Sequence, residues 1–302
     1  MSLFPTRRKF LQMAAAGAGL GTLAIAGDGT IFEANRPQLV SIEVRLSRLA
    51  GSWDGFRIAQ LSDFHYDDYF SVVPLRKAID IVNGLQPDLV VLTGDFVTSP
   101  GKRPSHALTA RAAKAAARAI EPCAELLIQI HASSGMLAVL GNHDVDTDAA
   151  HIVEVLQSHN IPVLRNRSVP FEREGKRLWF SGVDDILRGK PRLDLALRGI
   201  PADDPVVLLA HEPDWADHVA TRPVDLQLSG HSHGGQIRIP LIGAPYLPPL
   251  ARKYPWGLRE IGRLTLYTNV GIGTVNVPMR LGCPPEVTLI TLRKTPTGGG
   301  AV

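Results

Sequence analysis

Short apolar runs alternate with amphipathic stretches along most of this 302-residue chain. Continuous aliphatic runs bounded by polar residues or glycine predict buried strands, at residues 56–61, 88–93, 136–140, 206–210 and 225–229. Helical spacing of the apolar residues predicts helices at 74–85, 108–120 and 148–159, with Pro122 expected to interrupt the second. This alternation of strands and helices is typical of an α/β domain.

The rest of the pattern consists of shorter strands and irregular segments. Further strands are predicted at 169–171, 177–181, 263–268 and 287–292. The first two flank Glu174-Gly175 and should form a β-hairpin. Residues 234–256 are rich in Gly, Pro and aromatic residues. We find no internal repeat, so residues 52–294 are expected to form one domain, followed by a disordered tail at 295–302.

The N-terminus has the layout of an export signal. Residues 7–9 are Arg-Arg-Lys, and an uncharged run rich in Ala and Gly extends from 12 to 27. The run is shorter than the ~20 residues that span a bilayer comfortably, and residues 24–26 (Ala-Ile-Ala) fit a cleavage site. Residues 6–11 resemble the twin-arginine signal. Residues 1–27 are therefore expected to engage the twin-arginine export machinery, as a cleaved signal peptide or an uncleaved tether to the inner membrane. The protein should be exported, to the periplasm or cell envelope.

Composition excludes several classes of protein. With 45% hydrophobic and 20% charged residues, the chain can bury a sizeable core and is not a disordered chain. The 32 basic residues exceed the 29 acidic ones by three, and residues 7–9 account for that excess. The remainder lacks the basic surplus of a nucleic-acid-binding protein, and no nucleic-acid partner is predicted. Cys123 and Cys283 form no CxxC pair, which leaves two small buried hydrophobes or one disulfide as alternatives.

Potential metal ligands follow five of the predicted strands. In α/β sheets, loops at the carboxyl ends of strands carry polar groups to a shared rim. Asp63 and His65 lie two residues apart, so in extended backbone both point to the same side. These oxygen and nitrogen ligands suit two borderline divalent ions such as Mn, Fe or Zn better than a thiolate zinc site. The candidates are Asp63, His65, Asp95, Asn142, His211, His231 and His233.

Each of these motifs is weak evidence alone, although those at 141–144 and 230–233 are rarer than the others. Five of them in this order, each at the end of a strand, argue against coincidence. Together they resemble the full motif series of the calcineurin-like metallophosphoesterases, over residues 56–233. The motifs are Asp63-x-His65, Gly94-Asp95, Gly141-Asn142-His143-Asp144, His211 and Gly230-His231-x-His233. The resemblance implies a four-layer α/β/β/α sandwich with two mixed β-sheets.

The same resemblance implies a chemistry. One divalent ion would be bound by Asp63, His65 and His233, the other by Asn142, His211 and His231, and Asp95 would bridge the two. A metal-bridging hydroxide would then hydrolyse a phosphoester substrate. Residues 230–236 and 254–257 further resemble a bacterial branch of exported or membrane-associated phosphodiesterases, which favours a diester over a monoester.

His143 and Asp144 are the candidate catalytic residues beside the metals. An imidazolium at His143 could stabilise an oxyanion or protonate the leaving oxygen, and Asp144 could orient or charge it. Thr98 stands where the family often has an acid in its second motif, which puts a supporting contact in doubt. The remaining histidines are interpreted as solvated or packing residues: His106, His131, His151, His159 and His218.

Three alternatives stay open at this level. One is a pyrophosphatase acting on a nucleotide-linked lipid precursor at the membrane. Another is a non-catalytic metal- or phosphate-binding protein, although neither His143 nor Asp95 is eroded. The third concerns residues 246–256, which could contact a membrane surface or close over the site. Arg252, Lys253 and Arg259 could bind a second phosphate of the substrate or a lipid headgroup, or they could be solvated surface charges.

Overall fold

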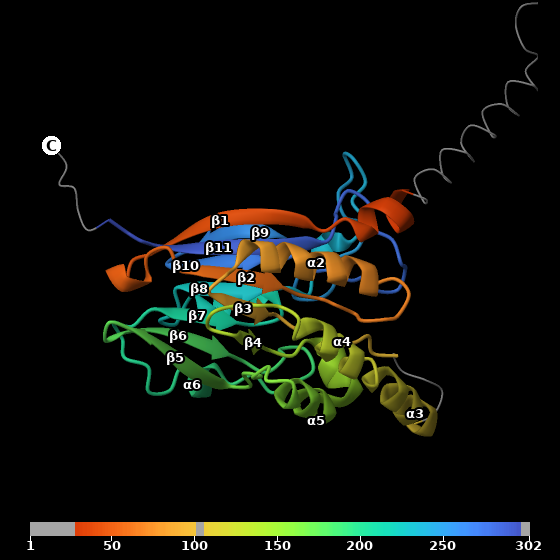
Figure 1. Ribbon diagram of the computed structural model, residues 1–302, viewed down its shortest axis with the longest axis horizontal. Coiled ribbons are helices and arrows are strands. Elements are labelled where there is room, and N and C mark those ends of the chain that lie inside the picture. Colours follow the sequence, from red (N-terminus) through yellow and green to blue (C-terminus); the bar gives the residue numbers. More distant parts are fainter. Residues whose placement is uncertain (1–27, 101–105, 297–302) are drawn as a thin grey trace, which may run out of the picture.

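Two mixed β-sheets pack face to face at the centre of the molecule (Figure 1). The computed structural model describes residues 28–100 and 106–296. The first sheet has the order β1-β11-β2-β3-β4, and the second has the order β5-β6-β7-β8-β10-β9. Aliphatic and aromatic side chains from both sheets form the core between them, including Ile58, Val91, Phe180, Leu209 and Leu228.

The strand bounds follow the predicted apolar runs. In the first sheet they are β1 Gln38–Leu46, β11 Glu286–Lys294, β2 Arg57–Leu61, β3 Leu89–Leu92 and β4 Met136–Ala138. In the second they are β5 Arg167–Arg173, β6 Lys176–Gly182, β7 Val206–Leu209, β8 Leu226–Ser229, β10 Leu264–Thr268 and β9 Gly257–Ile261. The predicted hairpin forms between β5 and β6, where Glu174 (φ 51°) and Gly175 (φ 68°) adopt the left-handed backbone of a tight turn.

Helices cover the outer face of each sheet. On the first sheet they are α2 Val72–Leu85, α4 Ile120–Leu127 and α5 Asn142–Ser158, and α3 His106–Ala117 packs against α5. On the second they are the short α6 Leu193–Ala196 and α7 Ala216–Val219. Along β3, Val90 and Leu92 pack under the helices while Leu89 and Val91 face the other sheet, because successive side chains alternate between faces. The predicted four-layer α/β/β/α sandwich is confirmed.

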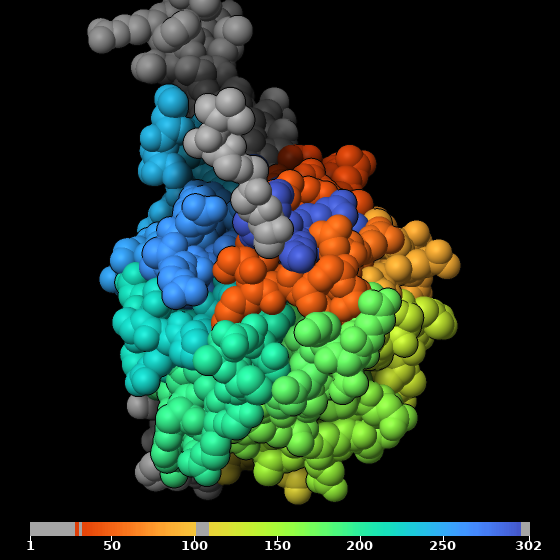
Figure 2. All heavy atoms as spheres, turned by 90° about the vertical axis from the view of Figure 1, so that its left-hand side faces the viewer, coloured from red at the N-terminus to blue at the C-terminus, as the bar shows by residue number. Residues whose placement is uncertain are grey.

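Three predictions of element bounds need correction. The domain does not begin at residue 52, because β1 pairs in parallel with β11 along its whole length; in Figure 2 these strands, orange and dark blue, lie side by side. The strand pattern missed β9, whose residues are mostly exposed. Pro122 does not interrupt a helix: α3 ends at Ala117, and Pro122 lies in the first turn of α4, where its missing N–H costs no helical hydrogen bond.

Several remaining expectations concern the chain ends and the cysteines. Both cysteines are buried free thiols, so they are two small hydrophobes and not a disulfide. Among the described residues, none of the helices combines the length and apolar composition that crossing a bilayer requires. The expected signal segment, 1–27, and most of the expected tail lie outside the described residues. Buried apolar residues of the described chain run from Ala34 to Leu292, so a chain that begins at Asp28 carries this whole core.

The inter-sheet core predicts a large cost for truncating Phe180. This fully buried ring contacts Phe171 edge-on, with ring centroids 5.3 Å apart. We expect Phe180→Ala to lower the free energy of unfolding by about 3–5 kcal/mol in urea denaturation, through lost burial and a residual cavity. Tyr69→Ala, at a side chain that is 83% exposed, should change it by no more than about 0.5 kcal/mol. Equal effects of the two substitutions would contradict this packing.

Candidate metal centre

The polar strand ends of both sheets meet at one rim, and their backbones are unusual. Five of the seven candidate ligands adopt left-handed conformations that non-glycine residues rarely occupy: Asp63 (φ 51°), His65 (φ 41°), Asp95 (φ 56°), His231 (φ 67°) and His233 (φ 49°). Hydrogen bonds between loops fix these conformations. The Asp63 N–H donates to the Gly94 carbonyl at 2.9 Å, and the His65 N–H donates to the Asp95 carbonyl at 3.0 Å. Backbone strain of this kind concentrates at functional sites.

Glycines allow the loops to approach one another. A Cβ on Gly230 would overlap Ser62 and the Asp63 carboxylate, and a Cβ on Gly94 (φ 97°) would lie 2.5 Å from the Gly141 nitrogen. No larger residue fits at either position without moving a candidate ligand. The glycines of the sequence motifs therefore set the spacing between the loops.

The side chains form two groups with Asp95 between them. Potential ligand atoms of Asp63, His65 and His233 lie within 4.8 Å of one another. The same holds for those of Asp95, His211 and His231. Asp95 Oδ2 lies 3.2 Å from His211 Nε2 and 3.6 Å from His65 Nε2, so this carboxylate faces a histidine of each group.

The histidine rings are oriented by their second nitrogen atoms. His211 Nδ1 donates to the Thr93 carbonyl at 2.6 Å, and His231 Nε2 donates to the Pro249 carbonyl at 2.8 Å. The opposite nitrogen of each ring is then the candidate ligand atom, and it can bind an ion whenever it carries no proton. A carbonyl acceptor behind a metal-binding histidine is the usual means of fixing its tautomer.

Thr98 takes part in the same arrangement. Its hydroxyl lies 3.0 Å from His65 Nδ1, which leaves His65 Nε2 facing Asp95. The departure from the family pattern therefore replaces an acid by a neutral hydroxyl group that contacts a candidate ligand.

Burial shapes the charges of the group. Burial raises the pKa of Asp63 to about 6, and it lowers the pKa of His65 and of His231 to about 3 each. These two histidines are therefore neutral at pH 7, the form that binds metals. Burial also disfavours the charged forms of Asp95 and His211, but their mutual attraction holds the pKa of Asp95 well below and that of His211 well above the usual values. A divalent ion would displace the His211 proton.

Asn142 gives the clearest sign that the site fits a metal. Its side-chain Oδ1 is buried and has no hydrogen-bond partner among the described residues. A buried polar oxygen without a partner is costly in a folded protein. An amide oxygen is a suitable ligand for a divalent ion, and the family resemblance implies that Asn142 binds one together with His211 and His231.

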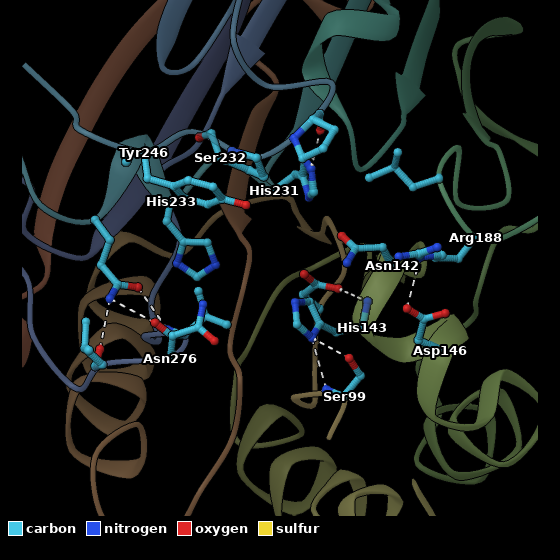
Figure 3. Close-up of a pocket in the computed structure, with 18 of the residues that line it drawn as sticks. Ser99, Asn142, His143, Asp146, Arg188, His231, Ser232, His233, Tyr246 and Asn276 are labelled. Atoms are coloured by element: carbon cyan, nitrogen blue, oxygen red, sulfur yellow. Dashed lines mark hydrogen bonds and ion pairs between the residues drawn. The ribbon is translucent and has the colours of Figure 1, made fainter. Parts of the chain in front are cut away.

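The His143 side chain lines the pocket, and one nitrogen of its ring is held by Ser99 (Figure 3). Its Nδ1 accepts the backbone N–H of Ser99 at 3.0 Å, and the Ser99 hydroxyl lies at the same distance. The His143 N–H of the backbone donates to Asp95 Oδ1 at 2.9 Å, which places this residue directly beside the shared carboxylate. Because a backbone N–H can only donate, Nδ1 is the acceptor of this contact, and Nε2 is the ring nitrogen left to donate to a bound group. Sequence reasoning missed Ser99, which no motif marks.

Asp144 does not orient His143, contrary to our expectation. Its buried carboxylate accepts backbone N–H groups of Asp95 and Gly141 at one oxygen, at 2.8 and 2.9 Å, and of Phe96 and Val97 at the other. Four amides from two loops therefore converge on a single carboxylate. Asp144 holds the Asp95 loop against the first turn of α5.

The two groups lie at the base of a pocket of about 850 Å³. The motif residues Asp95, Asn142, His143, His231 and His233 line its polar base. One wall is apolar and comes from the segment after the last motif, with Pro245, Tyr246, Pro248 and Pro249. Elsewhere in the pocket lining, Arg188 pairs with Asp146 at 3.0 Å, and no sequence motif predicted this ion pair.

Comparisons with known proteins identify relatives of the whole chain. The family model described as calcineurin-like phosphoesterase matches residues 56–235. The metallophosphoesterase YkuE of Bacillus subtilis is 31% identical over 96% of this chain and 98% of its own length. Phosphodiesterase YaeI of Escherichia coli is 31% identical over 95% of this chain and 99% of its own length. The transmembrane protein with metallophosphoesterase domain of Danio rerio is 31% identical over 90% of this chain and 61% of its own length.

The position of Asp144 generates a testable prediction. In Asp144→Asn, an amide NH₂ would face backbone N–H groups, so we expect the free energy of unfolding to fall by about 1–3 kcal/mol in urea denaturation. Metal bound per chain, measured by elemental analysis after dialysis, should also fall because the Asp95 loop loosens.

Asp146→Asn is the matched control. This carboxylate is half-exposed and pairs with Arg188, so its loss should change stability by no more than about 0.5 kcal/mol and leave the metal content unchanged. If Asp144→Asn kept full stability and metal content, Asp144 would not brace the loop.

Proposed function

The chain belongs to the calcineurin-like phosphoesterase family, and on that basis we propose that it is a phosphodiesterase that uses two divalent ions, Mn, Fe or Zn. The observation that carries the proposal is the pair of ligand groups that lie on either side of Asp95, whose carboxylate faces a histidine of each. When bound, two ions supply Lewis acidity, generate a hydroxide nucleophile at neutral pH and orient the phosphoryl oxygens. The proposed allocation is Asp63, His65 and His233 to one ion, Asn142, His211 and His231 to the other, and Asp95 to both.

The charge of the ligand set supports binding of a phosphoryl anion. Two divalent ions carry four positive charges, and the carboxylates of Asp63 and Asp95 cancel two of them. The neutral Asn142 amide fills a ligand position without cancelling further charge. The base of the pocket would therefore stay positive and attract a phosphodiester.

His143 is the proposed hydrogen-bond donor to the substrate. The Ser99 N–H fixes the ring so that Nε2–H faces the pocket beside the Asp95 carboxylate. A donor held in this way stabilises charge on a phosphoryl or leaving-group oxygen without needing to reorient. Asp144 does not contact the substrate in this proposal, and it supports the site by holding the Asp95 loop in place.

Two observations favour a diester over a monoester. The E. coli relative of nearly the same length is named a phosphodiesterase. The pocket also has the apolar wall at Pro245–Pro249, which provides room for a second alcohol group that a monoester lacks. The same wall favours the second candidate, a pyrophosphatase for a nucleotide-linked lipid precursor. Turnover of detergent-dispersed lipid pyrophosphates together with no turnover of soluble diesters would support that candidate over the first.

We also propose that the protein is exported by the twin-arginine machinery to the periplasm or cell envelope. The Arg-Arg-Lys cluster and the uncharged run up to residue 27 support this proposal. The segment leaves two forms open, a cleaved signal peptide and a tether to the inner membrane.

Removal of the His143 imidazole should impair catalysis more than binding. We expect His143→Ala to lower kcat for bis(p-nitrophenyl) phosphate by about 10²–10⁴-fold, with metal content retained, because the lost group donates in the transition state. His151→Ala, at a histidine of α5 outside the pocket lining, should keep wild-type kcat. The proposal is wrong if His143→Ala retains full kcat, or if no diester is hydrolysed with any of the three metals.

The export proposal predicts that the paired arginines are essential. In cells producing the full chain, Arg7→Lys combined with Arg8→Lys should move the protein from the envelope fraction to the cytoplasm, as followed by immunoblotting of fractions. A single substitution at Lys9→Arg keeps the charge and should leave export unchanged. Unaltered export of the double variant would exclude the twin-arginine route.

A further inference from the structure

A loop beside the pocket exposes large aliphatic side chains at its tip. The docking loop, residues 239–246, lies between β8 and β9. The Leu241 side chain is fully exposed, and Ile242 and Tyr246 are 72% and 66% exposed. The loop projects from the body in Figure 1, and in Figure 2 it stands out from the surface as a light-blue ridge. Exposed apolar groups gathered in this way mark an interaction site.

The tip is held in its exposed conformation by the backbone. Ile239 and Gly243 exchange both backbone hydrogen bonds, at 2.9 and 2.8 Å, and the Ile242 N–H donates to the Ile239 carbonyl. Leu241 adopts a left-handed backbone (φ 68°), which is unfavourable for a bulky residue. The turn therefore displays Leu241 and Ile242 to solvent at a conformational cost that packing within the described chain does not offset.

The charges around the docking loop favour an anionic partner with an apolar interior. From Ile239 to Ala251 the sequence has no charged residue, and cationic residues stand at both ends, Arg238 before and Arg252 and Lys253 after. Arg252 is exposed. An apolar tip flanked by cations matches the interface of a bilayer that contains anionic lipids.

The start of the described chain lies beside the base of this loop. The Gly29 carbonyl accepts the Arg280 N–H at 3.0 Å, and the next residue, Leu281, pairs with Ile237 immediately before the loop. Twenty-seven residues precede Asp28, and their uncharged run extends from residue 12 to 27. Any attachment of that run to a bilayer would bring the docking loop to the same surface.

We propose that the docking loop inserts into the headgroup region of an anionic bilayer, with Leu241 and Ile242 as its anchors. The tip offers too few residues for a stable interface between two copies, which buries about 800 Å² per partner. Pro245 and Tyr246, at the far end of the loop, also line the pocket, so docking sets the pocket mouth at the lipid surface. The docking surface does not depend on the proposed hydrolysis.

Vesicle binding tests the proposal directly. Residues 28–302 retain the described core and omit the N-terminal run, so co-sedimentation with vesicles reports the loop. We expect binding to phosphatidylcholine vesicles that contain phosphatidylglycerol, and weaker binding to phosphatidylcholine alone. Leu241→Ser combined with Ile242→Ser should weaken the first binding by about tenfold or more, because each side chain loses burial in the bilayer.

A matched double variant and an activity assay separate the alternatives. Ile128→Ser with Leu258→Ser removes two other exposed aliphatic groups, 47% and 38% exposed, and should leave vesicle binding unchanged. Neither Leu241 nor Ile242 lines the pocket, so turnover of a soluble diester should also be unchanged in the loop variant. Vesicle binding without any diester turnover would remove the proposed function and leave the docking surface in place.

Three results would overturn the docking proposal. The first is no binding of the wild-type chain to either vesicle, and the second is equal binding by the loop variant. The third is a wild-type dimer that the loop variant dissociates while vesicles bind neither protein, since the loop would then contact a second copy.

Discussion

The Asp95 carboxylate is the constraint on which the rest of the site depends. It faces His211 and His65 from the two ligand groups, and its other oxygen accepts the backbone N–H of His143. One side chain therefore fixes both groups and the donor beside them. Such a position is possible only where strand ends from two sheets meet, because no single loop could supply ligands on all sides of one carboxylate.

Buried hydrogen bonds of Gln60 and Asp144 hold the ligand loops in this arrangement. Gln60 of β2 donates through its amide to the Thr93 hydroxyl, directly after β3, and to the Ser229 carbonyl of β8, so a buried polar contact joins the two sheets under the ligands. Asp144 joins the Asp95 loop to the first turn of α5. These contacts explain how ligand residues keep left-handed backbones that would relax in a free loop.

The sequence predicted the parts of the molecule whose signals are local. Continuous aliphatic runs such as that of β3 located the central strands, and the motif residues located every candidate ligand. The exposed strands gave no such signal: β1 and β9 carry charged residues such as Glu43 and Arg259 on open faces. The positions of Asp144 and Ser99 could not be predicted, because their partners are backbone amides and a ring that only the folded loops bring near.

The central claim is that two ions share Asp95, and anomalous diffraction from crystals grown with Mn²⁺ tests it most directly. The account predicts two peaks about 3.5–4 Å apart. One should lie beside Asp63, His65 and His233, the other beside Asn142, His211 and His231, and both within bonding distance of the Asp95 carboxylate. A single peak, or two peaks of which only one contacts Asp95, would contradict it.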